Sequence, residues 1–145
     1  MELTIRKAER TDLPDILRLY AQVDDGISMK LEDAEKIFHR FRTYPNYNLF
    51  VAVTDGKVTG SFELLIMDNL AHFGDPSGII EDVVVDEAHR SRGVGKKMME
   101  FAMEECRKYK CYKLMLSSHL DRKRAHRFYE RLGFEKHGYS YLVKL

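Results

Sequence analysis

Hydrophobic side chains recur every three or four positions in four segments of the chain, which is the spacing of an amphipathic helix. The helices that this pattern predicts cover residues 12–23, 31–43, about 94–109 and 122–132. The third is the clearest, because Val94, Met98 and Ala102 would face a core while Glu100 and Glu104 face water. All four helices therefore need an apolar surface to pack against.

Six segments combine β-branched or aromatic residues with alternating polarity, which predicts strands. They cover residues 2–8, 48–54, 57–67, 79–85, 112–118 and 134–145. Asp55 and Gly56, a strong signal for a hairpin turn, join the second strand to the third. The resulting order, β-α-α-β-β-β-α-β-α-β, predicts an α/β fold with a central mixed, mostly antiparallel sheet flanked by helices. We expect a single domain over residues 1–145.

Composition restricts the classes of protein to which the chain can belong. It has 145 residues, of which 44% are hydrophobic, enough for one packed core. No apolar run approaches the roughly 20 residues of a membrane span, and the N-terminus lacks the apolar centre of a signal peptide. Only Cys106 and Cys111 occur, which argues against a secreted disulfide scaffold. We expect a cytoplasmic protein with reduced thiols and no membrane partner.

The net charge of +1 conceals two oppositely charged halves. Residues 1–87 hold 9 Lys and Arg against 17 Asp and Glu, a balance of −8, whereas residues 88–145 hold 15 against 6, a balance of +9. The basic half favours an anionic ligand or nucleic acid, and the acidic half favours a cationic ligand. Alternatively, the charges simply mix on the folded surface.

The segment "HRSRGVGKK", residues 89–97, places basic side chains around two glycines between a predicted buried strand and a predicted helix. It lacks the third glycine of the dinucleotide fingerprint, and Arg90 and Lys97 replace the Gly and the Ser or Thr of a Walker A loop. The first N–H groups of a helix nevertheless bind anions, and glycine lets the backbone approach a phosphate. The segment therefore predicts either an anion site or an ordinary basic turn.

Two motifs in residues 78–134 decide between these readings, because together they resemble the Gcn5-related N-acetyltransferases. Arg90, Gly93 and Gly95 match the family's phosphate signature, Arg/Gln-x-x-Gly-x-Gly/Ala. The family's later motif, Ala-x-x-Phe-Tyr-x-x-x-Gly-Phe, is matched by Ala125, Phe128, Tyr129, Gly133 and Phe134. In wording the chain is most similar to the glucosamine-6-phosphate N-acetyltransferase branch, which implies a homodimer.

The resemblance implies the acyl-CoA N-acyltransferase fold, with acetyl-CoA as co-substrate and the primary amine of a small molecule as acceptor. The residues that it assigns to the coenzyme are Val83, Val84, Val85, Arg90, Ser91, Arg92, Gly93, Val94, Gly95, Lys96 and Arg122. The three valines would pair with the pantetheine arm through their backbone, and the loop would hold the pyrophosphate. Arg122 departs from the family pattern, because many relatives place a coenzyme-contacting Asn there.

Acetyl transfer to an amine needs a base for the ammonium proton and benefits from an acid for the departing thiolate. Tyr129 is the candidate acid from its place in the family motif, with a core tyrosine as the alternative. Glu81 is the candidate base, acting directly or through water. Asp82 is its rival, on the opposite strand face unless a bulge disturbs the alternation.

The acceptor itself is left open by the sequence, because the N-terminal third carries no recognisable motif. Acidic residues at 24, 25, 32, 33 and 35 favour a cation such as a polyamine or aminoglycoside, whereas the resemblance favours an amino sugar phosphate. The alternative functions are an acyl-CoA-binding module without turnover and acetylation of protein amines. Six scattered histidines show no metal-ligand spacing, and "KYKCYK" offers no continuous platform for bases, so we expect neither a metal nor nucleic acid.

Overall fold

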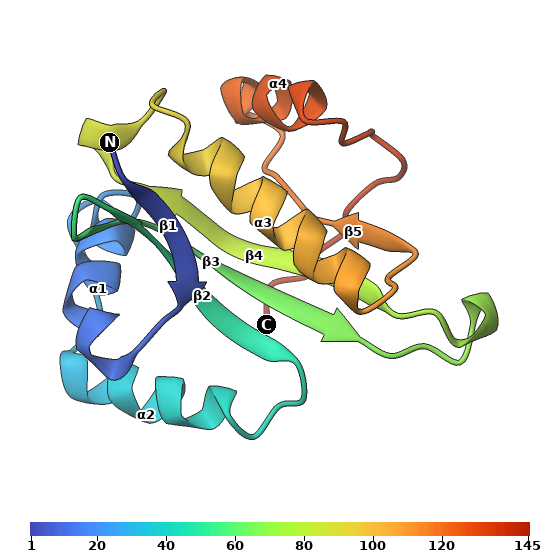
Figure 1. The fold of residues 1–145 in the computed structure, drawn as a ribbon, viewed down its shortest axis with the longest axis horizontal. Coiled ribbons are helices and arrows are strands. Elements are labelled where there is room, and N and C mark those ends of the chain that lie inside the picture. The colour runs from blue at the N-terminus through green and yellow to red at the C-terminus, as the bar shows by residue number, and fades with distance from the viewer. The chain divides into compact units, whose positions relative to one another are not determined.

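Five strands form one mixed sheet in the structure, a computed structural model that describes residues 1–145 (Figure 1). They are β1 (Leu3–Lys7), β2 (Tyr47–Thr54), β3 (Lys57–Met67), β4 (Ser77–Val85) and β5 (Lys113–Met115), in that spatial order. Neighbouring strands are antiparallel except for β4 and β5, which are parallel. The predicted mixed, mostly antiparallel sheet is therefore confirmed, as is the hairpin at Asp55 and Gly56.

Four α-helices accompany the sheet, close to the predicted ranges. They are α1 (Leu13–Ala21), α2 (Leu31–Phe41), α3 (Val94–Lys108) and α4 (Lys123–Arg131), with 3-10 turns at Arg10–Asp12, His72–Gly74 and Glu87–His89. None of them combines the length and the apolar character that crossing a bilayer requires. The residues group into two compact units, 1–115 and 116–145, which are described separately here.

In the first unit the helices cover both faces of the sheet because successive strand residues point to opposite sides. Leu49 and Val51 of β2 pack with Leu13 and Ile16 of α1, and α2 closes this core. Phe50, between them in sequence, points the other way and meets the Phe101 ring of α3, with ring centroids 5.1 Å apart. In Figure 1, α3 lies across the near face of the sheet. The helices α1 and α2 therefore share one face and α3 takes the other.

Two glycines inside strands allow α3 to lie this close to the sheet. A Cβ atom on Gly60 would lie 2.7 Å from Sδ of Met98, and one on Gly78 would collide with Sγ of Cys106. Any larger residue at either position would force the helix away from a closely packed interface. The hydrophobic pattern had marked both segments as strands without showing why these positions lack side chains.

The second unit contains α4 and an aromatic cluster. The Tyr129 ring lies edge-on to Phe128 and Phe134, at centroid distances of 5.1 and 5.6 Å. Gly133, with φ of +93°, ends the helix as expected, and the Phe134 N–H donates to the Tyr129 carbonyl. The predicted closing strand over residues 134–145 is wrong, since this segment pairs with no strand. The predicted strand at 112–118 is shorter, forming only over Lys113–Met115.

Candidate active site

The loop Arg90–Lys96 leads from the 3-10 turn after β4 into α3. Gly93 precedes the helix in a left-handed conformation with φ of +86°, and Ser91 has φ of +61°. A Cβ atom on Gly93 would have no neighbour within 4 Å, so glycine is needed there for its backbone angle and not for packing. The Lys97 N–H is bonded to the Gly93 carbonyl in the normal helical pattern. The N–H groups of Val94, Gly95 and Lys96 come before this first helical bond, so they have no partner within the helix.

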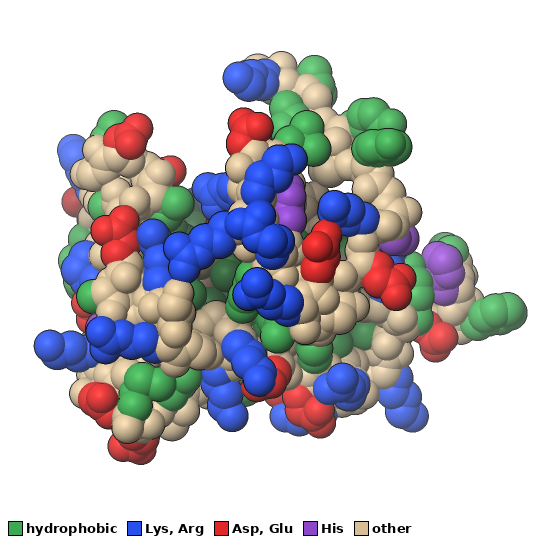
Figure 2. All heavy atoms as spheres, turned by 90° about the horizontal axis from the view of Figure 1, so that it is seen from above, with side chains coloured by type: hydrophobic (Ala, Val, Ile, Leu, Met, Phe, Trp, Pro, Cys, Tyr) green, Lys and Arg blue, Asp and Glu red, His purple; other side chains and the backbone are tan.

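Positive charge dominates the surroundings of this helix end. The first turn of α3 contains no acidic residue, and Arg92 and Lys96 are exposed. Figure 2 shows many exposed Lys and Arg side chains on one face of the molecule. Val94 contributes only backbone, because its side chain is buried in the core. Arg90 donates from Nε to the Val85 carbonyl at 3.2 Å, so this arginine also ties the loop to the end of β4.

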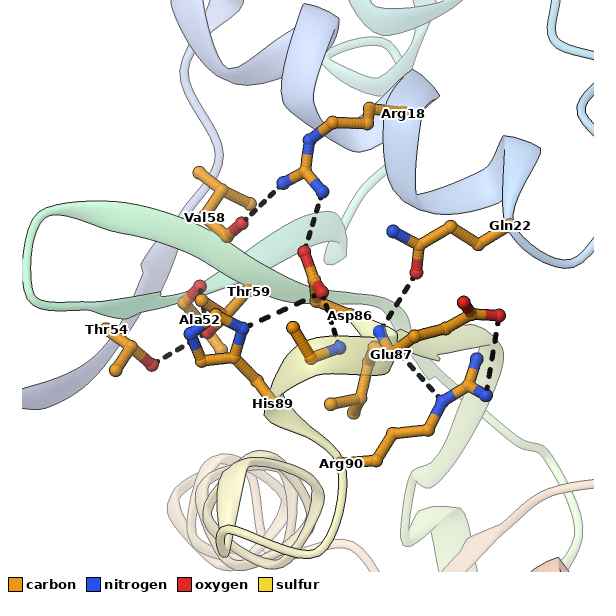
Figure 3. A network of polar contacts seen from close by, with 12 residues as sticks. Arg18, Gln22, Ala52, Thr54, Val58, Thr59, Asp86, Glu87, His89 and Arg90 are labelled. Atoms are coloured by element: carbon orange, nitrogen blue, oxygen red, sulfur yellow. Dashed lines mark hydrogen bonds and ion pairs between the residues drawn. The ribbon is translucent and has the colours of Figure 1, made fainter.

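Asp86, directly after β4, is the centre of a polar network that reaches the loop from α1 (Figure 3). Arg18 donates from Nη1 to Oδ2 of Asp86 at 2.6 Å and from Nη2 to the Val58 carbonyl at 3.0 Å. The other carboxylate oxygen accepts from the Ala88 N–H at 2.9 Å, and Gln22 accepts from the Glu87 N–H. Burial acts to raise the pKa of Asp86, but the hydrogen bonds from Arg18 and Ala88 outweigh it and lower the pKa.

The edge of β4 that faces β5 is open over much of its length. Pairing with β5 involves only Ser77–Ile79, so Ile80, Glu81, Val84 and Val85 pair with β3 alone, and residues 82–83 at the bulge have no strand partner. Val84 is buried, while Val83 and Val85 are half-buried. An extended ligand with amide groups can pair with such an edge as a further strand would. From the sequence, we expected the pantetheine arm to pair along this edge of β4.

A bulge in β4 displaces the two carboxylates that compete for the role of base. The register changes between Ser61 opposite Val84 and Glu63 opposite Glu81, and Asp82 has φ of +50°. The strict alternation of faces therefore fails at Asp82, as the sequence analysis had allowed. Both Glu81 and Asp82 are exposed.

Glu63 of β3 joins these two residues, and the sequence analysis missed it. Its Oε2 accepts a hydrogen bond from the Tyr47 hydroxyl at 2.5 Å. Burial is the main cause of a raised pKa for Glu63; the Tyr47 hydrogen bond opposes it, and the charges of Asp82 and Glu81 add to it. No sequence motif surrounds Glu63, and only the register of β3 against β4 brings it opposite Glu81.

A pocket of about 550 Å³ lies between α1, α2 and the sheet, and we call it the α1–α2 pocket. Glu63 and Asp82 line it together, whereas Glu81 does not. The Phe41 and Tyr47 rings stack at a centroid distance of 4.5 Å in its wall. The hydroxyl of Tyr20, another lining residue, is buried without a hydrogen-bond partner of standard geometry. A volume of this size suits a small molecule.

The acidic residues near α2 divide into two groups. Asp24 lines the α1–α2 pocket. Glu35 instead binds Arg10 at 2.8 Å, and Glu32 and Asp33 lie 3.6 and 3.8 Å from the Lys36 ammonium on the helix surface. Most of the cluster that suggested a cationic ligand is therefore engaged in surface ion pairs.

Tyr129 and Arg122 belong to the second unit. Burial is the main cause of a raised pKa for the Tyr129 phenol, and the charge of Arg122 opposes it. The phenol is therefore protonated at neutral pH and able to donate a proton. Arg122 is exposed at the N-cap position of α4.

Comparisons with known proteins point to one enzyme family and its fold. The model of the acetyltransferase (GNAT) family matches residues 12–134. Glucosamine 6-phosphate N-acetyltransferase of Arabidopsis thaliana is 31% identical over 89% of this chain and 87% of its own length. The enzyme of that name from Trypanosoma brucei brucei is 32% identical over 94% and 92%. The crystal structure of the Arabidopsis enzyme superposes with a TM-score of 0.86 at 28% identity, covering 99% of each chain.

Proposed function

This chain belongs to the acetyltransferase (GNAT) family and is an acetyl-CoA-dependent N-acetyltransferase. On that premise we propose that it acetylates the primary amine of a small molecule bound in the α1–α2 pocket. One observation carries the proposal: Asp82, which lines a pocket of ligand size together with Glu63, belongs to the strand that has an open edge and leads into the N-terminus of α3.

We propose that the coenzyme is held by the residues assigned to it from the sequence. The Arg90–Lys96 loop fits a pyrophosphate, because its helix end is free of acidic side chains and Gly93 leaves the space beside it open. The backbone of Val83, Val84 and Val85 would pair with the pantetheine arm along the open edge of β4. Arg122 is proposed to contact the coenzyme where many relatives use Asn. When bound, acetyl-CoA supplies the acetyl group as a thioester.

We propose that a carboxylate beside the bulge takes the proton from the acceptor's ammonium group. Glu81 is the candidate from the sequence. Glu63 is the stronger one, because it lines the pocket and its raised pKa brings it nearer to neutrality, where a general base is most effective. The neutral amine then attacks the thioester carbonyl, so that a C–N bond forms and the C–S bond breaks. The Tyr129 hydroxyl donates a proton to the departing thiolate, and the second proton, which the nitrogen loses on becoming an amide nitrogen, restores the phenol.

Release of free thiol in the presence of an amine panel tests the proposed function. The panel contains glucosamine 6-phosphate, which the relatives' names supply, together with spermidine, kanamycin, simple alkyl and aryl amines, and a lysine peptide. Amine-dependent release from a small molecule is the expected result. Coenzyme binding without release would favour the binding module, and release with the peptide alone would favour a protein acetyltransferase.

We also propose that residues 1–145 act as one domain and that two copies form a dimer. The family match, residues 12–134, extends across both compact units. The C-terminal segment exposes large apolar side chains, among them Tyr139, Tyr141, Leu142 and Val143, which is typical of a surface that a partner covers. Sedimentation equilibrium would test the dimer. A cytoplasmic location, also proposed, accords with the free thiols of Cys106 and Cys111.

A further inference from the structure

The wall of the α1–α2 pocket is mostly apolar. Aliphatic and aromatic side chains from both helices make up most of it, among them Ile16, Ile37, Phe38, Phe41 and Met29. From this lining we propose that the acceptor is a primary amine carried on an apolar body, aryl or branched alkyl, without a phosphate group. This inference rests on the proposed function and narrows its substrate class.

The polar groups of the pocket suit an ammonium group. Glu63 and Asp82 lie where β3 and β4 meet at the bulge, and Asp24 lines the pocket from the chain after α1. Carboxylates in a partly enclosed site attract a cation more strongly than they would in water. An amine would therefore be drawn to the part of the pocket that Glu63 and Asp82 line.

The same lining is unfavourable for a phosphate. Arg40 is the one cationic side chain that lines the pocket, against three carboxylates, so the formal charge of the lining is −2. Arg40 is also solvent-exposed and forms no ion pair. Phosphate sites in proteins combine several donors, such as paired cations or a helix N-terminus. A doubly charged phosphate in this pocket would meet repulsion from most of its charged groups.

The pocket also offers few hydrogen-bond partners for the hydroxyl groups of a sugar ring. Ser28 and the tyrosines are the uncharged lining residues with polar side chains, and Tyr47 already donates its proton to Glu63. Hydroxyl groups that leave water without gaining new hydrogen bonds weaken binding. An apolar body gives up no hydrogen bonds to water when it enters the pocket, and the burial of its surface against Phe38 and Phe41 favours binding.

The test compares phenethylamine and isoamylamine with glucosamine 6-phosphate, glucosamine and 2-aminoethylphosphonate. Both kcat/KM, from thiol release, and Kd, from calorimetry without acetyl-CoA, are measured. We expect kcat/KM for the two apolar amines to be at least about tenfold higher, and Kd at least about tenfold lower, than for the phosphate and phosphonate amines. A higher kcat/KM and tighter binding for either the phosphate or the phosphonate amine would overturn the inference and leave the proposed function standing. Binding of apolar amines without thiol release would contradict the proposed function and leave the inferred ligand preference of the pocket standing.

Two exposed positions supply variants with little risk to folding. Met29, 49% exposed, lines the apolar wall, and M29A should raise KM for phenethylamine about threefold to tenfold while changing that for 2-aminoethylphosphonate less. R40Q removes the one cation of the lining, and K57Q, at the exposed β2–β3 hairpin outside the pocket, is the control that should leave kcat/KM for phenethylamine unchanged. A tenfold loss on glucosamine 6-phosphate in R40Q, together with an unchanged response to M29A, would identify Arg40 as a phosphate ligand and contradict the inference.

Discussion

The Arg90–Lys96 loop is assembled from neighbours in the sequence, whereas the α1–α2 pocket draws its lining from elements spread over residues 13–82. Under the proposed function, the loop would bind the shared coenzyme through backbone groups: a left-handed glycine and the end of a helix, beside a strand edge. The pocket would bind the individual acceptor through side chains, which differ freely between proteins of one fold.

The largest effect is expected from G93E, which should weaken acetyl-CoA binding by about a hundredfold or more. Leaving glycine at φ of +86° costs about 1–2 kcal/mol, and a carboxylate at a helix N-terminus that binds an anion adds repulsion. Calorimetry with acetyl-CoA measures the change. Amine binding in the α1–α2 pocket, measured without coenzyme, should remain within about threefold of wild type.

G56E is the matched control for G93E. Gly56 has φ of +81°, and its Cβ position is equally free of neighbours, but it lies in the β2–β3 hairpin turn. The G56E substitution should lower Tm through the same backbone strain while leaving coenzyme affinity unchanged. Equal losses of coenzyme affinity in both variants would show that backbone strain, and not the anion site, explains the result.

The second-largest effect is expected from Y129F. It should lower kcat by about a hundredfold, which is the lower end of what a general acid contributes. Coenzyme affinity should stay near wild type, because the phenyl ring still packs between Phe128 and Phe134. Stopped-flow thiol release and calorimetry measure the two quantities. Y109F, at a tyrosine that is 44% exposed and lies outside the pocket lining, is the control and should leave kcat unchanged. An unchanged kcat in Y129F would remove Tyr129 from the mechanism.

The contrast between the two regions also explains what could be foreseen from the sequence. Arg90, Gly93 and Gly95 could be proposed as coenzyme residues because they match a family motif that lies between a predicted strand and a predicted helix. Glu63 was not identified, since its place opposite Glu81 depends on a register that includes a bulge. Gly60 and Gly78 had no visible role until α3 was placed against them. The failed strand at 134–145 shows the reverse case, in which local β-propensity is not sufficient without a partner strand.

Third, E63Q should lower kcat/KM by about tenfold to a hundredfold and change the pH profile. A base acts only when deprotonated, and the pKa of Glu63 is raised, mainly by burial. Wild-type kcat/KM should therefore fall as pH decreases through that pKa, and the acid limb should be absent in E63Q. E81Q is the comparison variant and should retain the limb. Loss of the limb in E81Q alone would return the role of base to Glu81.

The smallest effect is expected where the two regions are joined, at the ion pair between Arg18 of α1 and Asp86. Arg18 lies on the helix that lines the pocket, and Asp86 holds the turn that leads to the loop. R18M should raise KM for acetyl-CoA about threefold to tenfold with a smaller change in kcat, because the loop loses its support but none of its own groups. R18M and D86N should be non-additive in the double variant, since both remove one interaction.

The stability of R18M should depend on pH in a definite direction. The pKa of Asp86 is lowered in the folded state, so the stabilising pair is complete above the carboxyl's unfolded pKa and is lost as pH falls through the folded pKa. The difference in Tm between wild type and R18M should therefore be larger at pH 7 than at pH 3. A Tm difference independent of pH, with KM for acetyl-CoA unchanged, would mean that α1 and the loop are energetically separate. The coenzyme loop would then owe its shape to its own sequence alone.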